Sequence, residues 1–132
     1  MRAFTEQLSL RLITGTRRFL DLSARCEYRS DDPYTVRMRF GRDGDDEAQW
    51  VLSRDLLLAG LAAPAGHGDV HVEPGDHAHT LITLAAPGGT AVLQIATGVL
   101  ARFLAATAEL VPLGTENARI DWDGCIAELL SA

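Results

Sequence analysis

The sequence contains no lysine, since all 12 of its basic residues are arginine. Schiff-base chemistry and a phosphate-binding P-loop both need a lysine, so both are excluded. The sequence also lacks the Gly-x-Ser-x-Gly pattern of a serine nucleophile and the Gly-x-Gly-x-x-Gly pattern of dinucleotide-binding proteins. These absences argue against an enzyme, and we expect neither catalytic residues nor a cofactor.

Cysteine is scarce: Cys26 and Cys125 lie far apart and form no Cys-x-x-Cys pair. The first nine residues have charged side chains and no continuous apolar block, so they do not resemble a signal peptide. A membrane span needs about 18–20 apolar residues, but polar side chains interrupt residues 90–111, the best candidate. We therefore expect a cytoplasmic protein with reduced thiols and no membrane insertion.

The chain length of 132 residues suits one domain, because single hydrophobic cores are typical of about 100–200 residues. We therefore expect a single domain over residues 1–132. The net charge of -6 is unevenly distributed, because residues 55–132 contain few arginines and many acidic residues. Nucleic-acid backbones require a basic face, so we do not expect nucleic acid as a partner. The arginines of the first half keep a single-stranded nucleic-acid-binding protein as the alternative.

Alternating apolar and polar residues predict several strands in the first half of the chain. This pattern is typical of strands with one buried and one exposed face. Leu8, Leu10 and Leu12 alternate with polar residues, and Cys26 falls on the buried side of the next segment. The predicted strands are Phe4–Ile13, Leu20–Tyr28, Tyr34–Phe40 and Ala48–Leu52, separated by turn-forming residues.

After these strands, the apolar spacing changes to that of a helix. Ser53 is a suitable N-cap, Asp55 lies in the first turn, and the helix is expected to end before Pro64. This order, β4-α-β3-α-α, indicates an α+β domain with two antiparallel sheets packed with helices. The other predicted elements are strands over residues 66–73, 77–85 and 90–96, a helix capped by Thr97 to about Val111, and a helix from near Asp121 or Asp123.

Two clusters of polar residues have possible binding roles. The spacing of the histidines matches no zinc or metalloprotease pattern, so we interpret them as polar side chains on turns and an exposed sheet face, and their role stays open. Four arginines lie on predicted strands and turns and form either a phosphate-binding stripe or, as we favour, cross-strand pairs with Glu27, Asp31 or Asp32. The clusters are His67, His71, His77 and His79, and Arg25, Arg29, Arg37 and Arg39.

A series of short motifs runs along nearly the whole chain: Asp32–Val36, Trp50–Leu57, Gly60–Leu61 with Pro64, Gly68–Val72, Phe103–Thr107 and Val111–Glu116. In this order the motifs resemble the SsgA-like proteins of sporulating actinobacteria. The resemblance implies a non-catalytic regulator of cell division and sporulation at the septum. Such a regulator acts as an adaptor for division proteins, either FtsZ or another SsgA-like protein. The resemblance also implies a Whirly-like fold and a homotrimer.

Four polar residues within these motifs are candidates for binding a partner protein: Tyr34, Arg54, Asp55 and Asp69. Each also has a structural interpretation. Arg54 and Asp55, for example, are adjacent at a predicted helix start and could form a local ion pair there.

Overall fold

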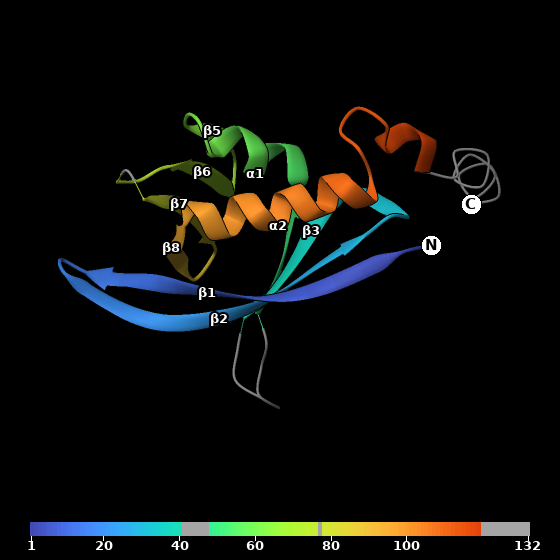
Figure 1. Ribbon diagram of the computed structural model, residues 1–132. Coiled ribbons are helices and arrows are strands. Elements are labelled where there is room, and N and C mark those ends of the chain that lie inside the picture. The colour runs from blue at the N-terminus through green and yellow to red at the C-terminus, as the bar shows by residue number, and fades with distance from the viewer. Residues whose placement is uncertain (41–47, 77, 120–132) are drawn as a thin grey trace.

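The computed structural model describes residues 1–40, 48–76 and 78–119. These residues form a curled antiparallel sheet with α2 lying across one of its faces (Figure 1). The strands are β1 (Ala3–Gly15), β2 (Arg18–Arg29), β3 (Asp32–Phe40), β4 (Ala48–Ser53), β5 (Ala65–His67), β6 (Val70–Pro74), β7 (His79–Ala86) and β8 (Gly89–Ala96). The helices are α1 (Arg54–Gly60), α2 (Thr97–Leu110) and a 3₁₀ helix over Glu116–Arg119.

All eight strands belong to one sheet with the order β4-β3-β2-β1-β8-β7-β6-β5. Strands β1 and β8 join its two halves through the pairs Arg11–Gln94 and Leu12–Leu93. The expectation of two separate sheets packed with helices is therefore wrong, and the Whirly-like fold is not supported. The alternation of side chains predicted most of the strands but carried no information about this long-range pairing.

The alternating pattern of the first strands places their apolar side chains beneath α2. Leu8 and Leu10 of β1 and Cys26 and Tyr28 of β2 are almost completely buried. The prediction that Cys26 belongs to the core is thus confirmed. Beyond this core the β1–β2 hairpin continues as an arm, and Phe19 near its tip is exposed (Figure 1).

Helix α1 begins where the sequence predicts. The side chain of Ser53 accepts a hydrogen bond from the backbone N–H of Leu56 at 3.1 Å, which confirms the predicted N-cap. Asp55 lies in the first turn, where its charge stabilises the positive end of the helix dipole. At the other end, Gly60 packs so closely against Val72 of β6 that a Cβ atom would overlap the valine side chain. This contact holds α1 against the sheet.

Helix α2 confirms the predicted helical face, because its buried residues are spaced three or four positions apart. They are Leu100, Phe103, Leu104 and Thr107. The sequence suggested Thr97 as the N-cap, but Ala96 takes that position. The Thr97 hydroxyl instead lies 2.9 Å from the hydroxyl of Thr80 on β7. No helix in the described residues is long and apolar enough to cross a membrane.

Two other predicted elements either differ from the structure or lie outside the described residues. Residues 66–73, expected as one strand, belong to two strands, β5 and β6, that form a tight hairpin. Its turn contains Gly68, whose φ of 70° favours glycine. The helix expected from near Asp121 or Asp123 lies outside the described residues, and so does His77.

Candidate functional site

The structure separates the four predicted partner-binding residues into two pairs. Arg54 and Tyr34 contact the segment that follows α2. Asp55 and Asp69 are both exposed, and each is next in sequence to a residue lining a cleft between β4 and β5. The first pair makes contacts within the fold, whereas the second pair lies on an accessible surface.

Arg54 is the first residue of α1, and its side chain is fully buried. It donates hydrogen bonds to the carbonyl oxygens of Thr107 at 3.3 Å and Val111 at 2.8 Å. Its Nη2 atom lies 2.6 Å from the carboxylate of Glu116, and its Cζ atom lies 5.2 Å from the centre of the Tyr28 ring. We call this arrangement of Arg54, Thr107, Val111, Glu116 and Tyr28 the Arg54 clamp.

The Arg54 clamp closes the C-terminal end of α2. The last carbonyl groups of a helix have no partner within it, and here a buried cation binds two carbonyl oxygens at this end. Hydrogen bonds from the backbone N–H of Glu116 and from Arg54 hold the pKa of the Glu116 carboxyl below its ordinary value of 4.5. Glu116 is therefore ionised at neutral pH and compensates the charge of Arg54.

Tyr34 fastens the same segment at a second point. Its hydroxyl donates a hydrogen bond to the side-chain oxygen of Asn117, and its ring is partly exposed. The expected local ion pair between Arg54 and Asp55 is replaced by the pair with Glu116. Glu116 and Asn117 were not identified as site residues from the sequence, although Glu116 ends one of its motifs.

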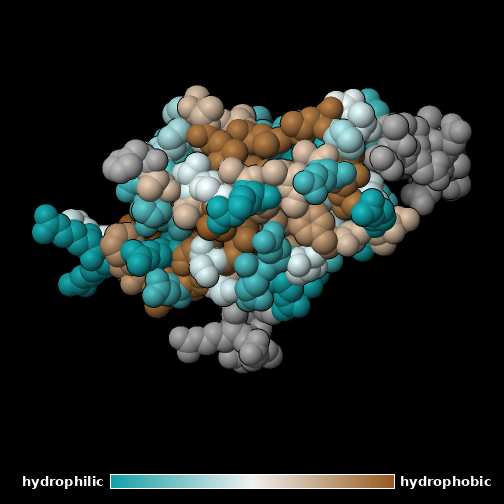
Figure 2. Space-filling model, viewed as in Figure 1, coloured by the Kyte–Doolittle hydropathy of each residue, from teal (hydrophilic) through white to brown (hydrophobic). Residues whose placement is uncertain are grey.

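The cleft beside Asp55 and Asp69 lies between the two outer strands of the sheet. Its volume is about 350 Å³, and it is lined by Val51 and Ser53 of β4, Leu56 of α1 and Gly66 and His67 of β5, among others. We call it the β4–β5 cleft. Figure 2 shows apolar surface gathered over α1, on the upper side of the view. This cleft is the most apolar candidate for a protein-binding surface at the predicted residues.

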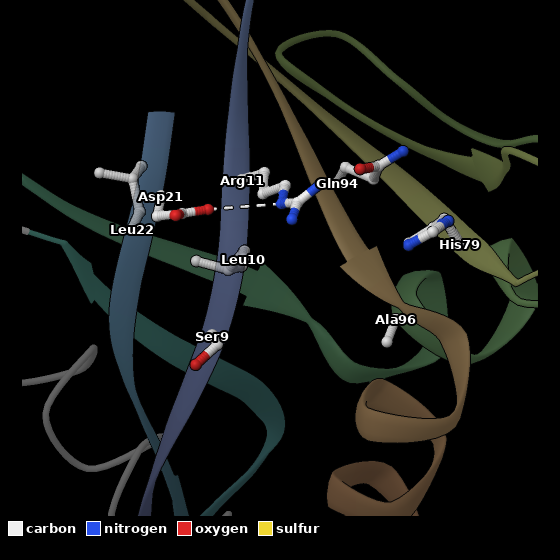
Figure 3. Close-up of a pocket in the computed structure, with 8 residues that line it drawn as sticks. All are labelled: Ser9, Leu10, Arg11, Asp21, Leu22, His79, Gln94 and Ala96. Atoms are coloured by element: carbon white, nitrogen blue, oxygen red, sulfur yellow. Dashed lines mark ion pairs between the residues drawn. The ribbon is translucent and has the colours of Figure 1, made fainter. Parts of the chain in front are cut away.

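A second cleft, of about 500 Å³, lies where β1 separates from β8 (Figure 3). Arg11 points toward Gln94 across it, and its Nε atom lies 3.3 Å from the carboxylate of Asp21. His79 faces the same opening and contacts Asp76 at 2.8 Å. Both carboxylates are largely exposed, so water weakens the Arg11–Asp21 ion pair and the contact between His79 and Asp76. The cleft contains no pairing of a nucleophile with a base.

The histidines do not assemble into a metal site in the part of the chain that the structure describes. There, no group of three or more His, Cys, Asp or Glu side chains has the geometry to hold a metal ion. His67 lies on β5, His71 on β6 and His79 at the start of β7. His79 has Asp76 as its partner.

The predicted arginine stripe is largely neutralised by neighbouring carboxylates. Arg29 forms two hydrogen bonds with Asp31, each 3.0 Å long, which raise its pKa. Arg37 forms ion pairs with Glu27 at 3.6 Å and Asp32 at 3.2 Å. Pairing with these acidic residues, the interpretation favoured from the sequence, is therefore confirmed for two arginines, and it reduces the positive potential available to a phosphate backbone.

Cys26 is not available as a nucleophile in the folded protein. Its side chain is 1% exposed, and burial together with the charge of Glu6 raises the pKa of the thiol to about 12. The reactive thiolate is therefore nearly absent at neutral pH.

Comparison with known proteins decides the family. Residues 22–116 match the family model described as the Streptomyces sporulation and cell division protein SsgA. The chain belongs to the SsgA family. Another protein of this kind, the sporulation-specific cell division protein SsgB of Kineococcus radiotolerans, is 41% identical over 129 residues, which cover 94% of this chain and 78% of that protein.

Solved structures of SsgA-like proteins share this fold. The SsgA-like sporulation-specific cell division protein of Thermobifida fusca is 36% identical and has a TM-score of 0.85, covering 96% of this chain and 95% of the other. The SsgB of Streptomyces coelicolor, in which mutations correlate with longitudinal cell division during sporulation, is 35% identical with the same TM-score. It covers 89% of this chain and 95% of its own. The SsgA-like assignment made from the sequence motifs is confirmed, and with it a role in sporulation and cell division.

Proposed function

We propose that this SsgA-family protein is a non-catalytic adaptor that binds other division proteins at the septum. FtsZ is the first candidate partner, and another SsgA-like protein is the second. The observation that carries the proposal is the likeness to SsgB proteins along nearly the full chain in both sequence and fold. The S. coelicolor relative supports it further, because mutations in that protein correlate with longitudinal cell division during sporulation.

The site residues support binding over catalysis. In the described residues, the clefts contain exposed ion pairs and apolar side chains, and the cysteine thiol is buried. We further propose that the protein is cytoplasmic and forms a homotrimer, since a small sheet domain gains buried area by association. Several copies in one assembly raise the avidity for a polymeric partner even when each contact is weak.

The test combines location with physical association in the native host. A fluorescent fusion is expected at sporulation septa, and a tagged chain is expected to capture FtsZ or an SsgA-like protein. A two-hybrid screen against septal proteins identifies which contact is direct. A chain that complements a deletion yet neither reaches the septum nor contacts a division protein contradicts the adaptor proposal.

A further inference from the structure

The two outer strands of the sheet leave backbone groups without strand partners beside an apolar cleft. Among the described residues, β4 pairs only with β3, and β5 pairs only with β6. Strand edges of this kind accept an added strand, because their N–H and C=O groups point outward. Helix α1 follows β4 and precedes β5 in the chain, and these two strands are the ends of the strand order.

The side chains around this opening are suited to an apolar residue. Val51 of β4 is 52% exposed, and Leu56 of α1 is half-buried at the same cleft. On the other side, Gly66 has a φ of 112°, and a Cβ there would overlap the carbonyl oxygen of Val70. Gly66 is thus required by the close approach of β5 to β6, and backbone forms this part of the cleft wall.

Charge at the rim indicates the chemistry of the occupant. Asp55 follows the lining residue Ser53 by two positions, and Asp69 precedes the lining residue Val70. Both are exposed, and neither forms an ion pair with a described residue. Arg37 of β3 is the cross-strand partner of Val51, but it is paired with Glu27 and Asp32, so Asp55 and Asp69 are the carboxylates beside the cleft that have no cation paired with them in the described residues. An occupant with basic side chains is complementary to this rim.

We propose that the β4–β5 cleft binds an extended segment of a partner protein, with an apolar side chain in the cleft and basic side chains on either side. The segment pairs with the edge of β4, as in other complexes formed by strand addition. The cleft has a volume of about 350 Å³, and the edge of β4 spans 6 residues, so the paired segment is short. This inference rests on the proposed protein-binding function and specifies where the contact is made.

The experiment uses two labelled seven-residue peptides in which valine alternates with arginine or with glutamate. Fluorescence anisotropy measures their binding to the full-length chain. We expect the arginine peptide to bind at least tenfold more tightly than the glutamate peptide. Replacing both Asp55 and Asp69 by asparagine should weaken binding of the arginine peptide about twofold to fivefold per residue, as for exposed ion pairs.

Two arginine substitutions separate the cleft from the general charge of the chain. Val51→Arg places a large, positively charged side chain at the cleft, where it should exclude the apolar side chain of the arginine peptide and repel its arginines. Binding of the arginine peptide should weaken at least tenfold. Leu20→Arg is the matched control, because Leu20 is 48% exposed on the distant β1–β2 arm. It adds the same charge and should leave binding within about twofold. Hydrogen exchange should slow in Ala48–Ser53 when the peptide binds and stay unchanged in the arm.

Several results overturn the proposal. They are equal binding of the two peptides, equal effects of Val51→Arg and Leu20→Arg, and absence of protection in β4. If Val51→Arg dissociates an oligomer of the wild-type chain, a second copy occupies the cleft and the proposal is wrong. Binding to a division protein distinguishes the two levels of inference. If the wild-type chain and the Val51→Arg variant bind the division protein equally, only the cleft proposal fails. If the wild-type chain does not bind any division protein, the adaptor function itself is contradicted.

Discussion

Replacing Arg54 by methionine tests whether the Arg54 clamp stabilises the fold. The change retains much of the buried side-chain volume but removes two hydrogen bonds to carbonyl oxygens and the ion pair with Glu116. Removing one partner of a buried ion pair typically costs about 3–5 kcal/mol, because the other charge stays buried without compensation. The free energy of unfolding of a native domain is about 5–15 kcal/mol, so the expected loss is a large fraction of it.

The assay is thermal and urea unfolding followed by circular dichroism. A loss of this size lowers Tm by about 10–20 °C for a chain of 132 residues. Arg11→Met is the matched control: Arg11 forms an exposed ion pair with Asp21, and its loss should cost at most about 1 kcal/mol.

A double-mutant cycle tests the ion pair itself. Glu116→Gln combined with Arg54→Met should destabilise the chain less than the sum of the two single changes, because neither group is then left with a missing partner. A stabilising role for the Arg54 clamp is refuted if Arg54→Met lowers the free energy of unfolding no more than Arg11→Met, or if the effects of Arg54→Met and Glu116→Gln are additive.

Three further predictions follow from burial and contacts. Because the folded-state pKa of Glu116 is lowered, its contribution to stability is complete above its ordinary pKa of 4.5 and is lost as the pH falls through the lowered value. In urea unfolding, Glu116→Gln should therefore lose less of its free energy of unfolding in acid than the wild-type chain does. Equal losses in the two proteins would contradict this. Cys26, with its pKa of about 12, should react with iodoacetamide at pH 8 only after unfolding, as mass spectrometry of its peptide would show; rapid modification of the native chain would disagree. Gly60→Ala should lower the free energy of unfolding in urea by about 1–3 kcal/mol, because the new Cβ atom meets Val72. Gly88→Ala is the control: its Cβ atom would lie in open space, so stability should change by less than about 0.5 kcal/mol. Similar effects of the two changes would exclude close packing as the cause.

The local elements could be predicted because their signals are local. In β1 and β2, alternate apolar side chains fix which face is buried, and Cys26 lies where this pattern places it. Ser53 caps α1 because its hydroxyl reaches a backbone N–H within the next turn. Such features depend on residues a few positions apart, so a single sequence contains the necessary information.

The joining of the sheet could not be predicted in this way. Strands β1 and β8 meet only at Arg11–Gln94 and Leu12–Leu93, although these partners are about eighty positions apart in the chain. An alternating pattern shows that a strand has a buried face, but it does not identify its neighbour. The prediction of two separate sheets failed at this contact. The hairpin of β5 and β6 was missed because three residues are too few to establish a period.

The candidate site, too, could be predicted from the sequence only in part. Exposed acidic residues in the motifs were found from the sequence, but their common position beside the β4–β5 cleft depends on how α1 and β5 pack. Arg54 was identified as a partner-binding candidate, yet it is buried against Glu116, which lies 62 positions later. Arginine is usually exposed, so only the fold reveals that this one has a carboxylate and two helix carbonyls as partners.

Co-sedimentation of the purified chain with FtsZ polymers from the same organism tests the adaptor function most directly. We expect the folded wild-type chain to enter the pellet in a saturable manner, with micromolar affinity, and to stay in the supernatant when FtsZ is not polymerised. A variant that no longer forms oligomers should bind the polymers much more weakly. If the folded chain stays in the supernatant at every polymer concentration, direct binding to FtsZ is contradicted, and if it also binds no other division protein, the adaptor function is contradicted as well.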